Sequence, residues 1–278
     1  MHQHLLVSDA DHFRVEDEIN PWMDRADQPE PAAARTEHEA LVAAHAAAGR
    51  AVERLPSAPD CPDMVFTANA ALVRGDRAVL GRPPAAREGE IVHHRTWLRE
   101  RGIVAEEPPY AFSGQGDALP VLGDVLLAGY GQRTDARVHP VLAERLDYEV
   151  VPLRTTSPAF YDLDLAVGVV DPDRLVAWCP EALDEPSRRR VRALRGRGLE
   201  LVEVAAGEAE RFALNLVGDG TTVTMSRGCP GLAGDLRSRG LVVHELDTGQ
   251  LAKSGGGVRC TALTLDAPAR PGTDREAA

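Results

Sequence analysis

Five predicted helices begin at intervals of roughly 50 residues along the chain, and this regularity restricts the folds that it can adopt. A strand-like run follows each helix, commonly after a glycine that fits a left-handed helix cap. Further pairs of strand-like runs, joined by turns, lie between these units. The predicted helices start near Thr36, Arg87, Asp135, Asp184 and Cys229, and residues 24–35 are predicted to be a loop that enters the first helix.

Each repeat therefore holds about three strands and one helix, which makes the chain an α/β protein. Five such units close most simply as a ring, in which strand ends and loops converge on a central pocket. An ordinary α/β domain with coincidental spacing is the alternative. We expect a single domain over residues 1–266 and a frayed tail over residues 267–278, which are rich in Pro, Asp and Arg.

Composition limits the partners and the compartment. Apolar residues make up 44% of the chain, and the net charge of −12 disfavours nucleic acids and anionic membranes as partners. No apolar run approaches the ~18 residues of a membrane span, and no secretory signal is visible. The four cysteines lie far apart without a CxxC pair, which favours a reducing cytoplasm. We expect no cofactor and no metal, because His93 and His94 are adjacent and their side chains would diverge.

One cysteine stands in a setting suited to chemistry. Cys260 follows three glycines, residues 255–257, which allow unusual backbone turns and a close approach to a ligand. Arg259 beside it would favour the thiolate, which is the nucleophilic form of cysteine. A buried structural cysteine at the head of a C-terminal strand is the alternative, and the local sequence does not decide between them.

Polar residues also interrupt apolar segments elsewhere. Asp63 and Asn69 stand at the two ends of a predicted apolar strand, residues 61–70. Asparagine is depleted in strands, so Asn69 either recognises a planar ligand nitrogen or marks a bulge or turn. Arg133 follows two glycines at a strand end, where its planar guanidinium would suit a carboxylate, and a surface arginine is the alternative.

Asp162 and Asp164 are the polar residues least expected in an apolar segment. If their segment is extended, the two carboxylates face the same side. That arrangement is costly unless one carboxylate binds a cation, one is protonated, or both face water. Ser113 and Asp117 lie in a glycine-flanked turn, which by itself carries little weight.

Taken together, seven segments resemble the guanidine-modifying superfamily of arginine deiminases, dimethylarginine dimethylaminohydrolases and amidinotransferases, and within it the dimethylaminohydrolase-like and arginine dihydrolase-like branch. The resemblance runs nearly from end to end. It implies a five-bladed α/β propeller with pseudo-fivefold symmetry. The segments are Ile19–Met23, Pro62–Ala70, Gly114–Leu119, Gly129–Thr134, Phe160–Asp164, Asn215–Val217 and Gly255–Cys260.

The resemblance also implies residue roles. Cys260 matches the nucleophile that attacks the guanidinium carbon and forms a covalent thioether intermediate. The matched substrate-binding positions are Asp63 and Asn69 for the guanidinium, Arg87 and Arg133 for the α-carboxylate, and Asp117 and Asp164 elsewhere in the site.

Two catalytic residues of the family are absent. Its histidine, which protonates the leaving amine and later deprotonates water, is replaced by Asp162. Its glutamate is replaced by Ser113. His244, in the last strand before the cysteine loop, is the one other histidine near a motif. The catalytic assignment is therefore Cys260, Asp162 and Ser113.

Two functions are compatible with these residues. The first is a divergent cysteine-dependent hydrolase of guanidino C–N bonds in arginine, methylated arginine or another modified arginine, with Asp162 as acid and base. A carboxyl group near a second carboxylate in a dry site can have its pKa raised toward neutrality, and can then donate a proton. Hydrolysis is favoured over amidino transfer. The second is an inactive family member that binds a guanidino compound or a protein partner. The expected partner is a small guanidino molecule, and the sequence leaves homo-oligomerisation open.

Overall fold

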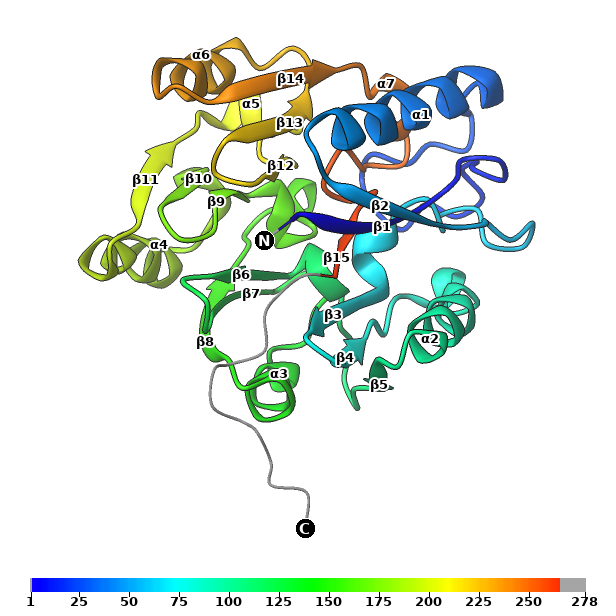
Figure 1. Ribbon diagram of the computed structural model, residues 1–278, viewed down its shortest axis with the longest axis horizontal. Coiled ribbons are helices and arrows are strands. Elements are labelled where there is room, and N and C mark those ends of the chain that lie inside the picture. Colours follow the sequence, from blue (N-terminus) through cyan, green and yellow to red (C-terminus); the bar gives the residue numbers. More distant parts are fainter. Residues whose placement is uncertain (1, 266–278) are drawn as a thin grey trace.

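The computed structural model describes residues 2–265, in which fifteen strands form five separate three-stranded sheets. Every sheet has the same plan, in which a middle strand pairs with one neighbour antiparallel and with the other parallel. The sheets surround a common centre (Figure 1), so the five-unit α/β propeller expected from the spacing and the resemblance is confirmed.

The strands are listed here by sheet. The first sheet contains β15 (Leu263–Thr264), β1 (His4–Ser8) and β2 (Ala51–Leu55). The second contains β3 (Ala71–Arg74), β4 (Arg77–Leu80) and β5 (Val104–Glu106). The third contains β6 (Ala118–Val121), β7 (Val125–Tyr130) and β8 (Glu149–Arg154). The fourth contains β9 (Val167–Asp171), β10 (Leu175–Trp178) and β11 (Glu200–Glu203). The fifth contains β12 (Val217–Gly218), β13 (Thr222–Ser226) and β14 (Val242–Leu246).

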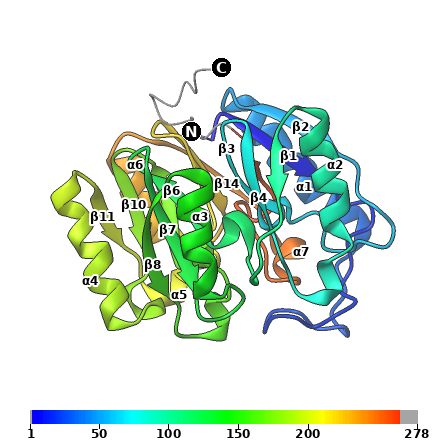
Figure 2. The same ribbon diagram turned by 90° about the horizontal axis from the view of Figure 1, so that it is seen from below.

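One helix connects the two parallel strands of each sheet and lies on the outer rim of the ring (Figures 1 and 2). Parallel neighbours need such a crossover, whereas antiparallel ones need only a turn. The five helices are α1 (Pro31–Ala47), α2 (Glu90–Glu100), α3 (His139–Leu146), α4 (Glu185–Ala193) and α6 (Pro230–Ser238). Two short helices, α5 (Ala206–Ala209) and α7 (Gly249–Ala252), lie between units.

The predicted helix starts agree with the structure at α4 and α6, which begin directly after Asp184 and Cys229. The predicted loop over residues 24–35 is wrong at its end, because α1 already begins at Pro31. The side chain of Glu30 accepts hydrogen bonds from the first turn of α1, which allows this earlier start. Near the other two predicted starts, Arg87 and Asp135, a 3₁₀ turn precedes the α-helix, which is α2 or α3.

Strands from the two ends of the described chain close the ring. β1 pairs antiparallel with β15, with Leu6 opposite Leu263, and it pairs in parallel with β2. The first sheet therefore joins residues that lie far apart in the sequence. The predicted tail, residues 267–278, lies outside the described residues.

The predicted strand over residues 61–70 is wrong, and two further segments at the centre of the ring also contain turns. Residues 61–70 form turns and the 3₁₀ helix η1 (Thr67–Ala70), where the N–H of Ala68 donates to the carbonyl of Cys260 rather than to a strand partner. The expected extended segment at Asp162 leads into the 3₁₀ helix η6 (Leu163–Leu165). Cys260 lies in a turn, and the strand after it is only the two-residue β15.

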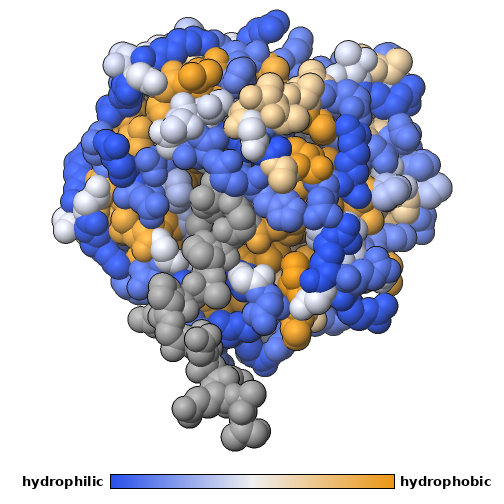
Figure 3. Space-filling view, in the orientation of Figure 1, coloured by the Kyte–Doolittle hydropathy of each residue, from blue (hydrophilic) through white to orange (hydrophobic). Residues whose placement is uncertain are grey.

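Apolar side chains fill the space between each sheet and its helix. Trp178, Phe112 and Leu126 are among the largest fully buried side chains, and each contributes roughly 1.5–3 kcal/mol by burial. The face seen in Figure 3 is mostly hydrophilic, with hydrophobic residues in separate patches. Within residues 2–265, no helix combines the length and the apolar character that crossing a membrane would require.

Candidate active site

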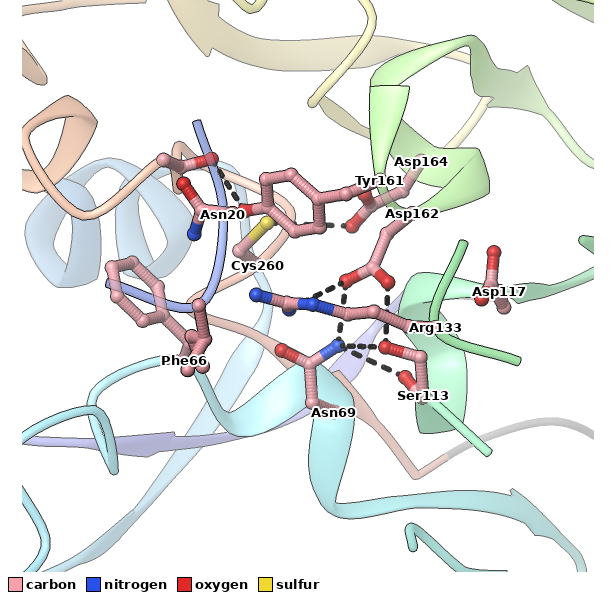
Figure 4. A network of polar contacts seen from close by, with 12 residues as sticks. Asn20, Phe66, Asn69, Ser113, Asp117, Arg133, Tyr161, Asp162, Asp164 and Cys260 are labelled. Carbon is pink, nitrogen blue, oxygen red and sulfur yellow. Dashed lines mark hydrogen bonds and ion pairs between the residues drawn. The ribbon is translucent and has the colours of Figure 1, made fainter. Parts of the chain in front are cut away.

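Residues at equivalent positions in the five units form the candidate site. A short turn at the centre of the ring precedes the first strand of every sheet, and each of these turns supplies at least one polar side chain to the centre (Figure 4). They include η1, η6 and a third 3₁₀ helix, η3 (Gly114–Gly116). The residues supplied are Asn69, Ser113, Asp162, Asp164, Asn215 and Cys260.

Cys260 is held by two side chains from other units. Its Sγ accepts a hydrogen bond from Nδ2 of Asn215 at 3.1 Å and donates to Oδ2 of Asp164 at 3.5 Å. Oδ1 of Asn215 accepts from the backbone N–H groups of Arg259 and Cys260. One asparagine thus fixes both the turn and the direction of the thiol.

The surroundings of Cys260 favour the thiol over the thiolate, contrary to the expectation based on Arg259. Burial, followed by the negative charge of Asp164, raises the pKa of Cys260 well above its ordinary value. The guanidinium of Arg259 donates to Oε1 of Gln115 and to the carbonyl of Ala262 rather than to the sulfur. The charge of Arg259 therefore does not outweigh burial and Asp164 at the sulfur.

The glycine loop before Cys260 approaches a side chain closely. A Cβ atom on Gly256 would lie 2.1 Å from Cε1 of Phe66, so only glycine fits against this ring. Gly255 has a φ of +84°, which also favours glycine. The loop predicted to approach a ligand thus packs against the aromatic wall of the site.

Asp162 accepts two side-chain hydrogen bonds and forms one ion pair. The hydroxyl of Ser113 donates to Oδ1 of Asp162 at 2.6 Å, and Nδ2 of Asn69 donates to Oδ2 at 3.0 Å. Nη1 of Arg133 lies 3.5 Å from the same Oδ2. Ser113 and Asp162, the two residues expected to stand in place of the family's glutamate and histidine, are therefore in direct contact, and Asp162 is fully buried.

The raised pKa expected of a carboxyl group in this site is found at Asp164 and Asp117. Burial, and then the charge of Asp162, raises the pKa of Asp164 well above its ordinary value. The same two causes raise the pKa of Asp117 to about 7. Oδ1 of Asp117 accepts from the N–H of Leu163, and Oδ1 of Asp164 has no hydrogen-bond partner among the described residues.

The two arginines predicted to bind a carboxylate differ in their surroundings. All three guanidinium nitrogens of Arg87 donate within the protein, to Glu90, to Oδ1 of Asn69 and to backbone carbonyls that include Asp63. Arg87 therefore positions Asn69 and the Asp63 turn. Arg133 stacks over the ring of Tyr161 at 4.0 Å, and its Nε has no partner among the described residues, so it keeps a donor for a ligand.

A narrow cavity opens beside Cys260, and its wall includes Asp63, Asn69, Arg87 and Arg133. Oδ1 of Asp63 accepts from the hydroxyl of Ser254, and burial raises the pKa of Asp63 to about 6. Larger hollows, such as the one beside Arg82, contain none of the site residues. The lining residues are Ile19, Asn20, Met23, Asp63, Phe66, Asn69, Arg87, Arg133, Tyr161, Ser254 and Cys260.

Sequence reasoning assigned no role to Asn20, Asn215 or Tyr161, although all three lie in the segments that carried the family resemblance. The hydroxyl of Tyr161 donates to the carbonyl of Gly255, and Nδ2 of Asn20 donates to the carbonyl of Ser254, so both fix the glycine loop. None of the described lining residues is a histidine, and His244 lies on β14, away from the cavity.

The chain is similar in sequence to characterised enzymes. No family model matches it. A dimethylarginine dimethylaminohydrolase of Mycobacterium tuberculosis is 34% identical over 254 residues, which cover 91% of this chain and 82% of that protein. A bifunctional arginine dihydrolase/ornithine cyclodeaminase of Nostoc is 32% identical over 274 residues, which cover 96% of this chain and 38% of that longer protein.

The fold is also similar to a solved structure. The N-terminal domain of ArgZ, a cyanobacterial arginine dihydrolase crystallised with its product, matches with a TM-score of 0.87 and 32% identity. The match covers 96% of this chain and 99% of that domain, so the similarity includes every unit of the ring.

Proposed function

Because the chain belongs to the guanidine-modifying superfamily of dimethylarginine dimethylaminohydrolases and arginine dihydrolases, we propose that it hydrolyses a guanidino C–N bond with Cys260 as the nucleophile. One observation carries the proposal: Sγ of Cys260 lies between Asn215 and Asp164, on the wall of a cavity that the carboxyl group of Asp63 also lines. A carboxyl group at the sulfur and a second one across the cavity suit a flat cation.

The charge of the substrate would activate Cys260. A guanidinium that enters beside Cys260 is a cation, and a nearby positive charge lowers the pKa of a thiol. In the proposed step the thiol proton passes to Asp164, which already accepts its hydrogen bond, and the thiolate forms next to the carbon that it attacks.

The reaction then has two halves. In the first, the sulfur–carbon bond forms, a C–N bond breaks, and the amine or ammonia leaves with a proton. In the second, a water molecule adds to the carbon, loses a proton, and displaces the sulfur. One water is consumed for each C–N bond broken, and the thiol is regenerated.

Proton transfer falls to the pair Asp162 and Asp164 instead of a histidine. Asp164 touches the sulfur and is the carboxyl group with the raised pKa, so it can donate a proton to the leaving amine. Asp162 raises that pKa by its charge and is itself oriented by Ser113. Asp162 thus occupies the place of the histidine and shares its task with Asp164.

The test is product analysis by mass spectrometry with arginine, methylated arginines, N-hydroxyarginine and agmatine. We expect at least one guanidino substrate to lose ammonia or an amine, with incorporation of one oxygen from labelled water. Cys260→Ala should abolish turnover, and a thioether intermediate should be trapped on Cys260 in the wild type. Turnover that persists in Cys260→Ala would refute the proposal.

An inactive binding protein is the second candidate, and the absence of histidine from the described cavity lining favours it. A haloacetamidine probe separates the two functions. Selective labelling of Cys260 supports the enzyme, whereas tight binding of a guanidino compound without labelling or turnover supports the binding protein.

A further inference from the structure

A second group of reactive side chains lies outside the cavity, at the outer edge of the second unit. Asp60, Cys61 and His93 each present one donor atom, and these three atoms lie within 4.8 Å of one another. Asp60 and Cys61 lie in the loop after β2, whereas His93 lies in the first turns of α2. The sequence analysis predicted no metal site at His93, because only the fold brings this residue to a cysteine 32 positions earlier in the chain.

We propose that Asp60, Cys61 and His93 form a binding site for Zn²⁺ or a similar divalent transition-metal ion. A thiolate, an imidazole and a carboxylate are the three ligand types that zinc uses in proteins. Three protein ligands leave the fourth tetrahedral position to water or to another small ligand. Calcium and magnesium are disfavoured because they require mainly oxygen ligands.

The side chains need only a small movement to coordinate an ion. Bond lengths of about 2.0–2.3 Å place the ligand atoms of a tetrahedral zinc site roughly 3.5 Å apart. Sγ of Cys61 is 4.0 Å from Oδ1 of Asp60, so these two are already close. Asp60 is exposed and His93 is half-buried, so both can rotate toward the buried sulfur.

The position of this group links it to the cavity. Asp63 follows Cys61 after a single proline, and Arg87 already connects the Asp63 carbonyl to Glu90 at the start of α2. A metal held by Cys61 and His93 would tie the same two segments together on the outside. The bound ion would therefore hold the Asp63 turn against α2 without entering the cavity.

Cobalt binding tests the site in the Cys260→Ser variant, which removes the cavity thiol as a competing ligand. Titration with Co²⁺ should give one bound ion per chain and a thiolate-to-cobalt charge-transfer band in the near ultraviolet. Cys61→Ser should abolish the band. His93→Ala should weaken cobalt binding by more than the ~10–100-fold that loss of a supporting contact costs. Because His93 is half-buried on a helix, this variant also tests the site without altering the buried thiol of Cys61.

Cys179→Ser is the matched control. Cys179 is buried, and its sulfur lies 3.5 Å from a carboxylate oxygen of Glu181, but no histidine completes a comparable group there within residues 2–265. This variant should bind cobalt as the parent does. A parent without the thiolate band, or equal affinity in the parent and in either Cys61→Ser or His93→Ala, would overturn the proposal. Since the readout is metal binding, the result is independent of whether the cavity hydrolyses guanidines.

Discussion

Nη1 of Arg133 lies 3.5 Å from Oδ2 of Asp162, and the same guanidinium stacks on the ring of Tyr161. The arginine expected to bind a substrate carboxylate is therefore paired with Asp162, the residue expected to stand where the family has its histidine. This contact would couple the choice of substrate to the residue at position 162.

The first prediction concerns this coupling. Asp162→Asn removes the negative charge beside Arg133, so binding of arginine should improve relative to agmatine, which has no α-carboxylate. We expect the ratio of the two dissociation constants, measured by calorimetry, to change by roughly tenfold, or about 1.4 kcal/mol. Ser113→Ala, which removes a hydrogen bond to Asp162 but no charge, should leave the ratio nearly unchanged. An unaltered ratio in Asp162→Asn would show that Asp162 does not restrain Arg133.

The reactivity of Cys260 should depend strongly on pH and on a bound cation. Because burial raises the pKa of Cys260 well above its ordinary value, alkylation by iodoacetamide should be slow near pH 7 and should accelerate as pH rises. A guanidinium ion in the cavity lowers this pKa and should accelerate the reaction at fixed pH. Peptide mass spectrometry measures the rate at Cys260, and the three other buried cysteines serve as internal controls. Fast alkylation near neutrality, without any effect of guanidinium, would contradict this prediction.

Asn215→Ala should destabilise the protein as well as displace the thiol. The substitution leaves the buried N–H of Cys260 without its acceptor, which costs about 1–3 kcal/mol, whereas the N–H of Arg259 keeps the backbone carbonyl of residue 215. Denaturant unfolding should show this decrease in the free energy of unfolding. Asn20→Ala is the comparison, since the side chain of half-buried Asn20 accepts only from the N–H of Trp22 among the described residues, and the loss there should be smaller. Equal losses would show that the acceptor role of Asn215 contributes little.

The pH dependence of the free energy of unfolding should reveal the raised pKa of Asp117. Its pKa is about 7 in the folded protein and near 4 in an unfolded chain. The folded state therefore holds the proton more tightly, and the stability gained below about pH 4 is lost as pH rises toward 7. Relative to Asp117→Asn, the wild type should lose up to about 1.4 kcal/mol of unfolding free energy per pH unit across this window. Denaturant unfolding of both proteins between pH 4 and pH 8 measures the difference, and parallel curves would argue against a raised pKa.

The repeat could be predicted because it depends on local sequence, and the central position of Cys260 could be predicted from the set of segments that resemble the family. Helix and strand periodicity repeats in every unit, with a glycine after four of the five helices, and needs no knowledge of tertiary contacts. The segments around Cys260 and Asp162 were informative for the same reason, since each is a short continuous motif. The central turns were mistaken for strands because residues such as Phe66 and Leu163 are apolar, and an apolar run does not distinguish a buried turn from a strand.

Charge states and partners could not be predicted, because they depend on residues that only the fold brings together. Arg87 is predicted to bind a substrate, and only the fold shows that its guanidinium also donates to Glu90 and Asn69. Arg259 is next to Cys260 in sequence, but its guanidinium donates to Gln115 and Ala262. The raised pKa falls on Asp164 because that residue is buried beside a second carboxylate, which is a property of three-dimensional packing.

The pairing of β1 with β15 also bears on when Cys260 joins the other residues of the site. Cys260 lies just before β15, so the thiol reaches its partners only when that strand docks beside β1. A chain leaves the ribosome from its N-terminal end at about 5–20 residues per second, and it exposes Asp63, Arg133 and Asp162 before the cysteine has been made. A chain cut short before the last unit therefore lacks the proposed nucleophile, and the proposed covalent chemistry requires the closed ring.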